Sequence, residues 1–196
     1  MVIEYGKFRT INMGDFVYNL EGDLVCPNNP IGTIDLYMTT HHGTDQSGSA
    51  AFVHAIQPRV AVMTNGTRKG GALPVYQALH TSPGLEDLWQ LHYAYAGGLE
   101  NNTPGLYIAN IEDPAVLGAS LSAPAPTPGG GGGGRGFSGG GGRGGSGRGP
   151  GGGGGGRGAG HTGPAFYIKV SAMPDGSFTV LNTRNNFSKT YAARKN

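Results

Sequence analysis

The sequence predicts an α/β fold, because segments typical of strands and of helices alternate along its first half. Residues 34–40 form an apolar run, residues 50–56 suit a helix begun by Ser47 or Ser49, and residues 60–64 form a second apolar run. A serine at a helix start accepts a hydrogen bond from a backbone N–H that the helix itself leaves unpaired. Strand, helix and strand in this order are typical of a parallel sheet with helices packed against it.

The segments on either side of this unit add further elements. Two apolar-rich runs, 2–5 and 8–13, are separated by Gly6-Lys7, which predicts a β-hairpin that ends at Gly14-Asp15. Asn, Gly and Pro are frequent in 16–33, so we expect a loop with one short helix there. Downstream we expect a helix over 75–80 begun by Pro74, a helix or extended segment over 85–93 with Trp89 in the core, and a strand over 106–111.

A glycine-rich block divides the chain into three parts. Gly supplies 39 residues, and 23 of the 32 residues from 129 to 160 are glycine. Such a segment buries too little apolar surface to offset the entropy of ordering its backbone, so we expect it to be disordered. Asp175-Gly176 lies between two alternating runs and predicts a hairpin. The expected organisation is a main domain over 1–113, an Ala/Pro- and then Gly/Arg-rich linker or insertion over 114–164, and a terminal hairpin over 165–196 that completes the domain.

Composition excludes several classes of protein. The net charge is +2 and the four arginines of the glycine-rich block contribute +4, so the rest of the chain carries −2. That part is therefore not a basic nucleic-acid-binding domain. A single cysteine, Cys26, excludes an intrachain disulfide and a zinc site made of cysteines alone. No apolar run is long enough to predict a membrane span and no signal peptide is predicted, so we expect a soluble protein, cytoplasmic or exported.

Polar residues that can bind a metal follow two of the predicted strands. Asp15 comes after the hairpin, and His41 and His42 come after the apolar run of 34–40. The carboxyl ends of neighbouring parallel strands meet at one rim of a sheet, where ligands bind in α/β folds. A carboxylate and an imidazole are suitable ligands for a divalent metal such as zinc. The alternative is that Asp15 is a turn or capping residue and that the two histidines are a polar strand end.

The order of these features resembles a known family. One strand leads to Gly14-Asp15, a second leads to His41-His42-Gly43, and a helix begun by serine and an apolar strand after Pro58 follow. This succession is similar to the C-terminal half of the metallo-β-lactamase fold, in its competence-type branch related to DNA internalisation. The resemblance spans residues 2–66 and implies part of an αββα sandwich in a hydrolase that uses two metal ions, zinc or alternatively manganese. In that family Asp15 would match the bridging aspartate, and either His41 or His42 would match a histidine ligand.

The sequence departs from the family in the rest of the metal site. The family's main ligand motif, His-x-His-x-Asp-His, is absent, and the remaining histidines are isolated at 54, 80, 92 and 161. Zinc sites need three or four protein ligands, so we expect an incomplete half of a hydrolase that is inactive alone. Because strand character begins at Met1, we expect a missing N-terminal half or a complementing chain to supply the other ligands.

Basic residues suggest two further contacts. Arg68 and Lys69 follow the strand of 60–64 and could bind an anionic substrate such as a phosphodiester, although a solvated turn has the same composition. The glycine-rich block is similar to RGG-type RNA-binding tails, and its arginines are Arg135, Arg143, Arg148 and Arg157. The alternative function is therefore a non-catalytic protein that binds RNA or DNA through this block. The alternative for the block itself is a plain linker.

Overall fold

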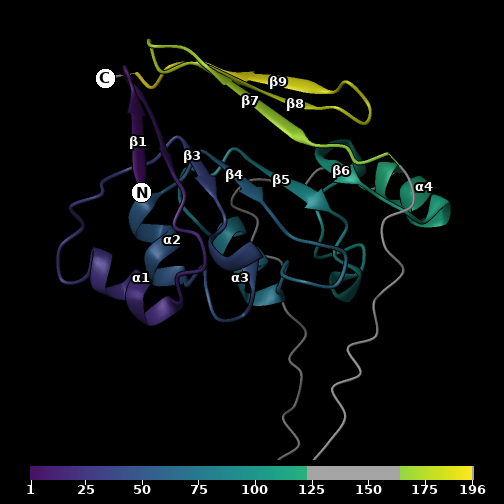
Figure 1. Ribbon diagram of the computed structural model, residues 1–196, viewed down its shortest axis with the longest axis horizontal. Coiled ribbons are helices and arrows are strands. Elements are labelled where there is room, and N and C mark those ends of the chain that lie inside the picture. Colours follow the sequence, from purple (N-terminus) through teal and green to yellow (C-terminus); the bar gives the residue numbers. More distant parts are fainter. Residues whose placement is uncertain (123–163, 196) are drawn as a thin grey trace, which may run out of the picture.

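A six-stranded sheet forms the centre of the molecule (Figure 1). The computed structural model describes residues 1–122 and 164–195. The strands lie in sequence order, with β1 and β2 antiparallel and β2 to β6 parallel, which confirms the α/β class. They are β1 (Val2–Tyr5), β2 (Phe8–Ile11), β3 (Leu36–Met38), β4 (Val60–Met63), β5 (Asp87–His92) and β6 (Ile108–Asn110).

Three helices cover one face of this sheet, as Figure 1 shows. They are α1 (Tyr18–Val25), α2 (Ala50–Ile56) and α3 (Leu73–His80), and short 3-10 helices occupy Thr40–Gly43, Tyr95–Gly97 and Gly105–Tyr107. The helix α2 has the predicted bounds, and its start is fixed by the Ser49 hydroxyl, which accepts a hydrogen bond from the Phe52 amide. None of the helices in the described residues has the length and apolar character needed to cross a bilayer.

A second, three-stranded antiparallel sheet lies on the opposite face of the six-stranded sheet. Its strands are β7 (Ile168–Ala172), β8 (Phe178–Asn182) and β9 (Ser188–Tyr191), so the predicted hairpin is confirmed and a third strand joins it. The fully buried Trp89 side chain donates a hydrogen bond from Nε1 to the Tyr191 hydroxyl over 3.0 Å. The last part of the chain therefore packs on the main domain and completes its core.

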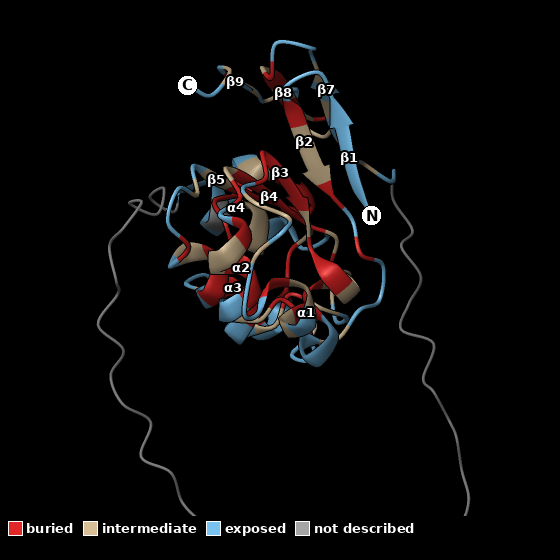
Figure 2. Cartoon of the chain, turned by 90° about the vertical axis from the view of Figure 1, so that its left-hand side faces the viewer, coloured by how far each residue is buried: buried red, intermediate tan, exposed pale blue. Residues whose placement is uncertain are grey.

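Burial follows from this layered arrangement. In β4, Val60 and Val62 face the small sheet while Ala61 and Met63 face the helices, so all four residues are buried. The continuous apolar run of this strand predicts that result, because alternate side chains point to opposite faces. The outer strand β1 is exposed along its whole length (Figure 2).

The structure differs from the sequence predictions at two strands and one helix. Residues 85–93, left open between helix and strand, form β5. The strand expected over 34–40 ends at Met38, because the Thr40 amide donates to the Tyr37 hydroxyl and the chain turns. The prediction of an irregular linker from residue 114 on is wrong for its first part, which forms α4 (Pro114–Ser122). The Asp113 carboxylate stabilises the start of this helix by accepting a hydrogen bond from the Ala115 amide. An Asp-Pro pair is a helix-start signal that the low-complexity composition masked. The glycine-rich block lies outside the described residues.

Candidate functional site

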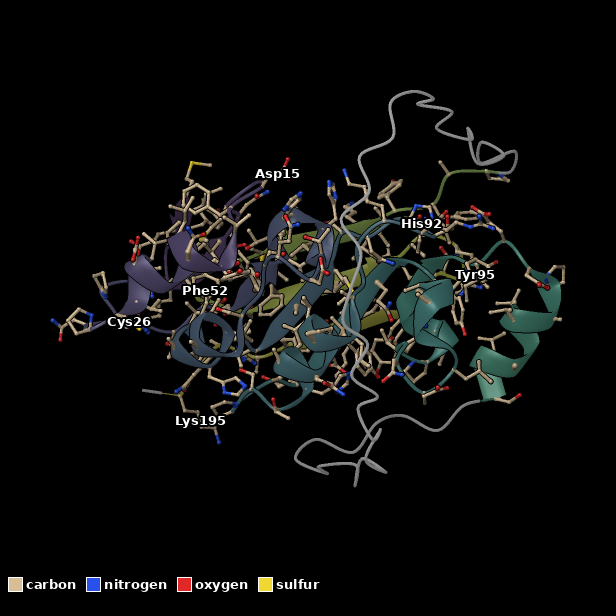
Figure 3. The ribbon with its side chains drawn as sticks, turned by 90° about the horizontal axis from the view of Figure 1, so that it is seen from below. Asp15, Cys26, Phe52, His92, Tyr95 and Lys195 are labelled. Carbon is tan, nitrogen blue, oxygen red and sulfur yellow. The ribbon has the colours of Figure 1, made fainter. Side chains whose placement is uncertain are left out.

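The parallel strands β2 to β5 present their carboxyl ends on one side of the sheet, which we call the carboxyl rim. It comprises residues 12–15 after β2, 39–45 after β3, 64–71 after β4 and 92–95 at the end of β5. Figure 3 shows Asp15 and His92 along this side and Lys195 on the opposite side. The rim therefore brings together the sequence-predicted segments that carry Asp15, the two histidines and the two basic residues.

The backbone of the histidine pair adopts an unusual conformation. His41, His42 and Gly43 have consecutive positive φ angles of 48°, 60° and 69°. Left-handed backbone costs a residue with a side chain about 1–2 kcal/mol, and such strain is typical of functional sites. The His41 amide donates to Gly14 O over 2.8 Å, and the Gly71 amide donates to His42 O over 3.1 Å. Hydrogen bonds from two neighbouring loops therefore hold the strained segment.

The His42 ring has a defined proton arrangement. Its Nδ1 lies 3.0 Å from the carbonyl oxygen of Thr64. Because a carbonyl oxygen only accepts hydrogen bonds, Nδ1 carries a proton, and in the neutral imidazole the lone pair is then on Nε2. Histidines that bind metals commonly donate their other ring N–H to a backbone carbonyl in this way. The His42 ring is thus arranged as a metal-ligating histidine would be.

The neighbouring His41 has unsatisfied polar atoms around it. His41 Nδ1 and Thr44 Oγ1 are buried and have no hydrogen-bond partner among the described residues. Buried polar atoms are paired in most proteins, and although His80 Nε2 is also buried and unpaired among the described residues, only at His41 does the unpaired nitrogen adjoin two consecutive left-handed residues. Either histidine of the pair therefore remains a candidate ligand.

The number of donors limits what the rim can bind. Asp15 is exposed, and its segment touches the histidine pair through the bond from the His41 amide to Gly14 O. Among residues 1–122 and 164–195, no three His, Cys, Asp or Glu side chains lie close enough together to hold a metal ion. The carboxylate and imidazoles suit zinc in their chemistry, but the described residues bring together fewer than the three or four protein ligands that zinc sites use.

The basic loop after β4 lies directly against the histidine pair. A Cβ atom added at Gly70, whose φ is +74°, would lie 1.9 Å from His42 O. Only glycine allows so close an approach of the two backbones. Arg68 and Lys69 are exposed, and none of the ion pairs in the described residues involves them. Two cationic side chains therefore face solvent on the loop whose Gly70 contacts His42.

Two rim residues were missed by sequence reasoning. Asn65 is buried, and its side chain clamps the main chain of His92: Nδ2 donates to His92 O over 2.7 Å and Oδ1 accepts from the His92 amide over 3.4 Å. His92 seemed isolated because 85–93 was not assigned to a strand. Once β5 is known, a histidine as its last residue belongs to the rim.

The other histidines have structural surroundings. His54 Nε2 lies 3.1 Å from both Ala78 O and Thr81 Oγ1, which joins α2 to α3. His80 stacks on Tyr76 with ring centres 4.2 Å apart, and burial lowers the pKa of its imidazole. His161 and the four arginines of the glycine-rich block lie outside the described residues.

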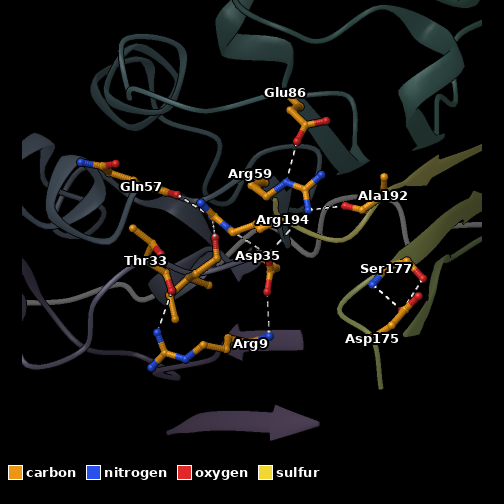
Figure 4. Close-up of polar contacts among 11 residues, drawn as sticks. Arg9, Thr33, Asp35, Gln57, Arg59, Glu86, Asp175, Ser177, Ala192 and Arg194 are labelled. Carbon is orange, nitrogen blue, oxygen red and sulfur yellow. Dashed lines mark hydrogen bonds and ion pairs between the residues drawn. The ribbon is translucent and has the colours of Figure 1, made fainter. Parts of the chain in front are cut away.

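The opposite side of the sheet, the amino rim, holds a closed charge network (Figure 4). Asp35, just before β3, is 4% exposed and accepts a hydrogen bond from Arg194 Nε over 3.0 Å. Its second oxygen accepts from the Arg9 amide over 2.9 Å. Arg59, just before β4, pairs with Asp35 at 3.7 Å and with Glu86 at 2.6 Å. This network anchors the C-terminal segment and leaves little charge available for a ligand.

Comparisons with protein-family models, with curated proteins and with solved structures find no match for this chain. The chemistry of the carboxyl rim is therefore judged from its own residues.

Proposed function

We propose that this chain supplies the aspartate and histidine part of the divalent-metal site of a hydrolase, with the remaining ligands coming from outside the described residues. The observation that carries the proposal is the left-handed His41-His42 pair beside Gly14-Asp15, with His42 Nδ1 committed to Thr64 O. Strain held by neighbouring hydrogen bonds, at the rim where α/β proteins bind ligands, supports a binding role.

Each residue has a distinct role in this proposal. His42 binds through Nε2, while its Nδ1–H···O bond to Thr64 keeps the ring oriented. The exposed Asp15 carboxylate has two oxygens and can serve two ions at once. Zinc, or alternatively manganese, supplies the positive charge that activates water and stabilises the attacking and leaving oxygens.

The basic loop favours an anionic substrate, and a phosphodiester is the class we propose. Arg68 and Lys69 are exposed on the loop that contacts His42 and are not neutralised by ion pairs within the described residues. Arg and Lys side chains stabilise phosphoryl oxygens through charge-assisted hydrogen bonds. The close packing of Gly70 on His42 keeps these cations near the proposed metal site.

The proposal includes a partner, either a missing N-terminal half or a complementing chain. The outer edge of β1 has no neighbouring strand within the described residues. Its apolar side chains Val2, Ile3 and Tyr5 are 36%, 45% and 53% exposed. An unpaired, apolar outer strand can accept an added strand from a partner, and β1 leads through β2 to Asp15.

Calorimetric titration of the full chain with Zn²⁺ tests this proposal. We expect binding with a Kd of about 1 µM, roughly −8 kcal/mol, because a pair of ligands binds less tightly than a complete site. The double variant Asp15→Ala, His42→Ala should lose this binding. A matched double variant, Asp23→Ala, His54→Gln, removes an exposed aspartate and a structural histidine away from the rim and should keep it. Equal zinc affinity in all three proteins would contradict the proposal.

Hydrolysis provides the second arm of the test. With Zn²⁺ or Mn²⁺ and a polypeptide that carries His-x-His-x-Asp-His, the chain should hydrolyse bis(p-nitrophenyl) phosphate, and Asp15→Ala should abolish this activity. Activity that survives Asp15→Ala would contradict a hydrolytic role for the rim. Binding of RNA or DNA without metal, lost on deletion of 129–160, would instead favour the non-catalytic alternative.

A further inference from the structure

Glu21 is a charged residue in an unusual place. It lies in α1, and its side chain is completely buried. Its Oε1 accepts a hydrogen bond from the Gly48 amide over 2.9 Å, and its Oε2 accepts one from the Ser49 amide over 3.0 Å. Among the residues that the structure describes, no Lys or Arg forms an ion pair with it. Burial of a carboxylate that receives hydrogen bonds from only two backbone amides costs free energy, so the presence of Glu21 at this position needs a reason.

The two hydrogen bonds join the two segments that carry the proposed metal ligands. Glu21 belongs to residues 14–21, which include Asp15, while its partners belong to residues 41–49, which include both histidines. The same segments are joined at two further points. The His41 amide donates to Gly14 O and the Tyr18 amide donates to Gln46 O, each over 2.8 Å. The contacts occur in the same order along both segments, so the segments run side by side.

Other buried hydroxyls continue this network to the histidine pair. The Ser47 hydroxyl lies 2.8 Å from Thr40 O and 3.1 Å from Thr44 O, on either side of the pair. On the N-terminal side of the histidine pair, the Tyr37 hydroxyl accepts a hydrogen bond from the Thr40 amide over 3.0 Å. Displacement of the loop at Gly48 would therefore be transmitted to the histidines.

We infer that Glu21 is a positioning residue, which fixes the segment of His41 and His42 against the segment of Asp15. This inference rests on the proposed metal-binding function. The simpler reading is that Glu21 only stabilises the start of α2, whose first turn is already capped by the Ser49 hydroxyl. A capping role alone affects the stability of the fold, whereas a positioning role also affects the histidine pair and its metal affinity.

The first test is Glu21→Gln in the full chain. The glutamine oxygen can accept from only one of the two amides, and its NH₂ group faces the other N–H. We expect hydrogen exchange at the Gly48 and His41 amides to accelerate about tenfold and zinc affinity to fall about tenfold, the size typical of lost support behind a metal ligand. Asp35→Asn, which changes a buried carboxylate at the amino rim, is the matched control: zinc affinity should stay unchanged, and any faster exchange should be shared by all amides that exchange through global unfolding instead of being concentrated at Gly48 and His41.

A second pair of variants covers the case in which Glu21→Gln does not fold. Ser49 has φ −58°, which proline can adopt. The substitution Ser49→Pro therefore removes the backbone N–H that donates a hydrogen bond to Glu21 Oε2. Ser49→Ala removes the same helix cap but keeps this N–H. The proline variant should show faster exchange at His41 and weaker zinc binding than the alanine variant.

The outcomes separate the two proposals. Unchanged exchange at His41 in folded Glu21→Gln, or identical behaviour of the two Ser49 variants, would overturn the positioning role of Glu21. Absence of zinc binding by the wild-type chain would overturn the proposed function, and the exchange measurements would then decide the role of Glu21 alone.

Discussion

Several charged side chains at the amino rim of the six-stranded sheet form ion pairs, whereas Asp15, Arg68 and Lys69 at the carboxyl rim form none within the described residues. The buried Asp35 pairs with Arg59 and with the partly exposed Arg194 before β3 and β4, and the Asp87 carboxylate accepts from Lys189 Nζ at 2.6 Å. Asp15, Arg68 and Lys69 take part in none of the ion pairs of the described residues. The same strands thus carry a network of ion pairs at the amino rim and charged side chains without ion pairs at the carboxyl rim.

The two rims also differ in backbone conformation. The carboxyl rim contains two consecutive left-handed residues, His41 and His42, while the amino rim has a single one at the end of α2, Gln57, and is tied by ion pairs to the C-terminal segment. Ion pairing stabilises the fold, whereas strain and unpaired charge cost stability and are retained where a site needs them. The comparison teaches that the amino rim holds the fold together and that the carboxyl rim is the side suited to bind a ligand.

The largest effect is expected at the amino rim. Asp35→Asn leaves Arg194 without a carboxylate and Arg59 with Glu86 alone, and we expect the free energy of unfolding to fall by about 3 kcal/mol, the lower end for breaking a buried pair because Arg194 is partly exposed. Urea unfolding measures this change. Glu4→Gln breaks the exposed pair with Arg9 and should cost less than about 1 kcal/mol. If Asp35→Asn and Glu4→Gln lower the free energy of unfolding equally, the buried ion pairs of the amino rim stabilise the fold no more than an exposed pair does.

The next effect concerns the contact between two carboxyl-rim loops. Gly70→Ala places a Cβ against His42 O at positive φ, so we expect a loss of about 2 kcal/mol and displaced NMR signals of the histidine pair. Gly84→Ala is the control, because Gly84 has φ +86° and nothing within 4 Å of the added atom. It should cost about 1 kcal/mol from backbone strain alone. If the two variants lose the same stability, the loop does not press on His42.

A stabilising substitution is expected at the strained pair. His41→Gly relieves a φ of +48° and removes the unpaired buried Nδ1, so we expect the unfolding free energy to rise by about 1 kcal/mol. Thermal unfolding checks the sign. Asn186→Gly, at φ +57° in the loop between β8 and β9, should give a smaller gain because asparagine tolerates this conformation better. A loss of stability in His41→Gly would argue against strain at the rim.

The smallest effect is a pH dependence away from both rims. Burial lowers the pKa of His80 below its ordinary value of 6.5, so the unfolded chain takes up this proton more readily than the folded one. Stability should therefore fall as the pH decreases through 6.5 and level off below the folded-state pKa. His80→Gln should show a shallower decrease in urea midpoint between pH 7 and pH 5, measured beside the wild type. An unchanged slope would assign the acid sensitivity to other groups.

Local patterns allowed much of the fold to be predicted. The start of α2 at Ser49, the doubly buried β4 and the hairpin of β7 and β8 each depend on residues close in sequence. The bond from Trp89 to Tyr191 spans 102 residues, and the bond from Arg194 to Asp35 spans 159. No local pattern reveals such pairs, which is why the closure of the amino rim was not predicted.

The residues gathered at the carboxyl rim were predictable from the sequence, but their geometry was not. Strand ends pointed to Asp15, His41 and His42, because parallel strands bring their carboxyl ends together. The left-handed conformation of the pair depends on hydrogen bonds from other loops, and the burial of Glu21 depends on packing of α1 against the loop before α2. The left-handed pair and the buried Glu21 depend on contacts between segments that are distant in the sequence, so composition and residue spacing do not predict them.

The most direct test of the carboxyl rim as the metal-binding side is a ¹⁵N–¹H NMR titration of the histidine rings with Zn²⁺. We expect the Nε2 signal of His42 to shift on zinc addition while its Nδ1 stays protonated toward Thr64 O, and His54 and His80 to remain unchanged. A zinc-dependent shift confined to His54 or His80, with the His41 and His42 signals unmoved, would contradict the account.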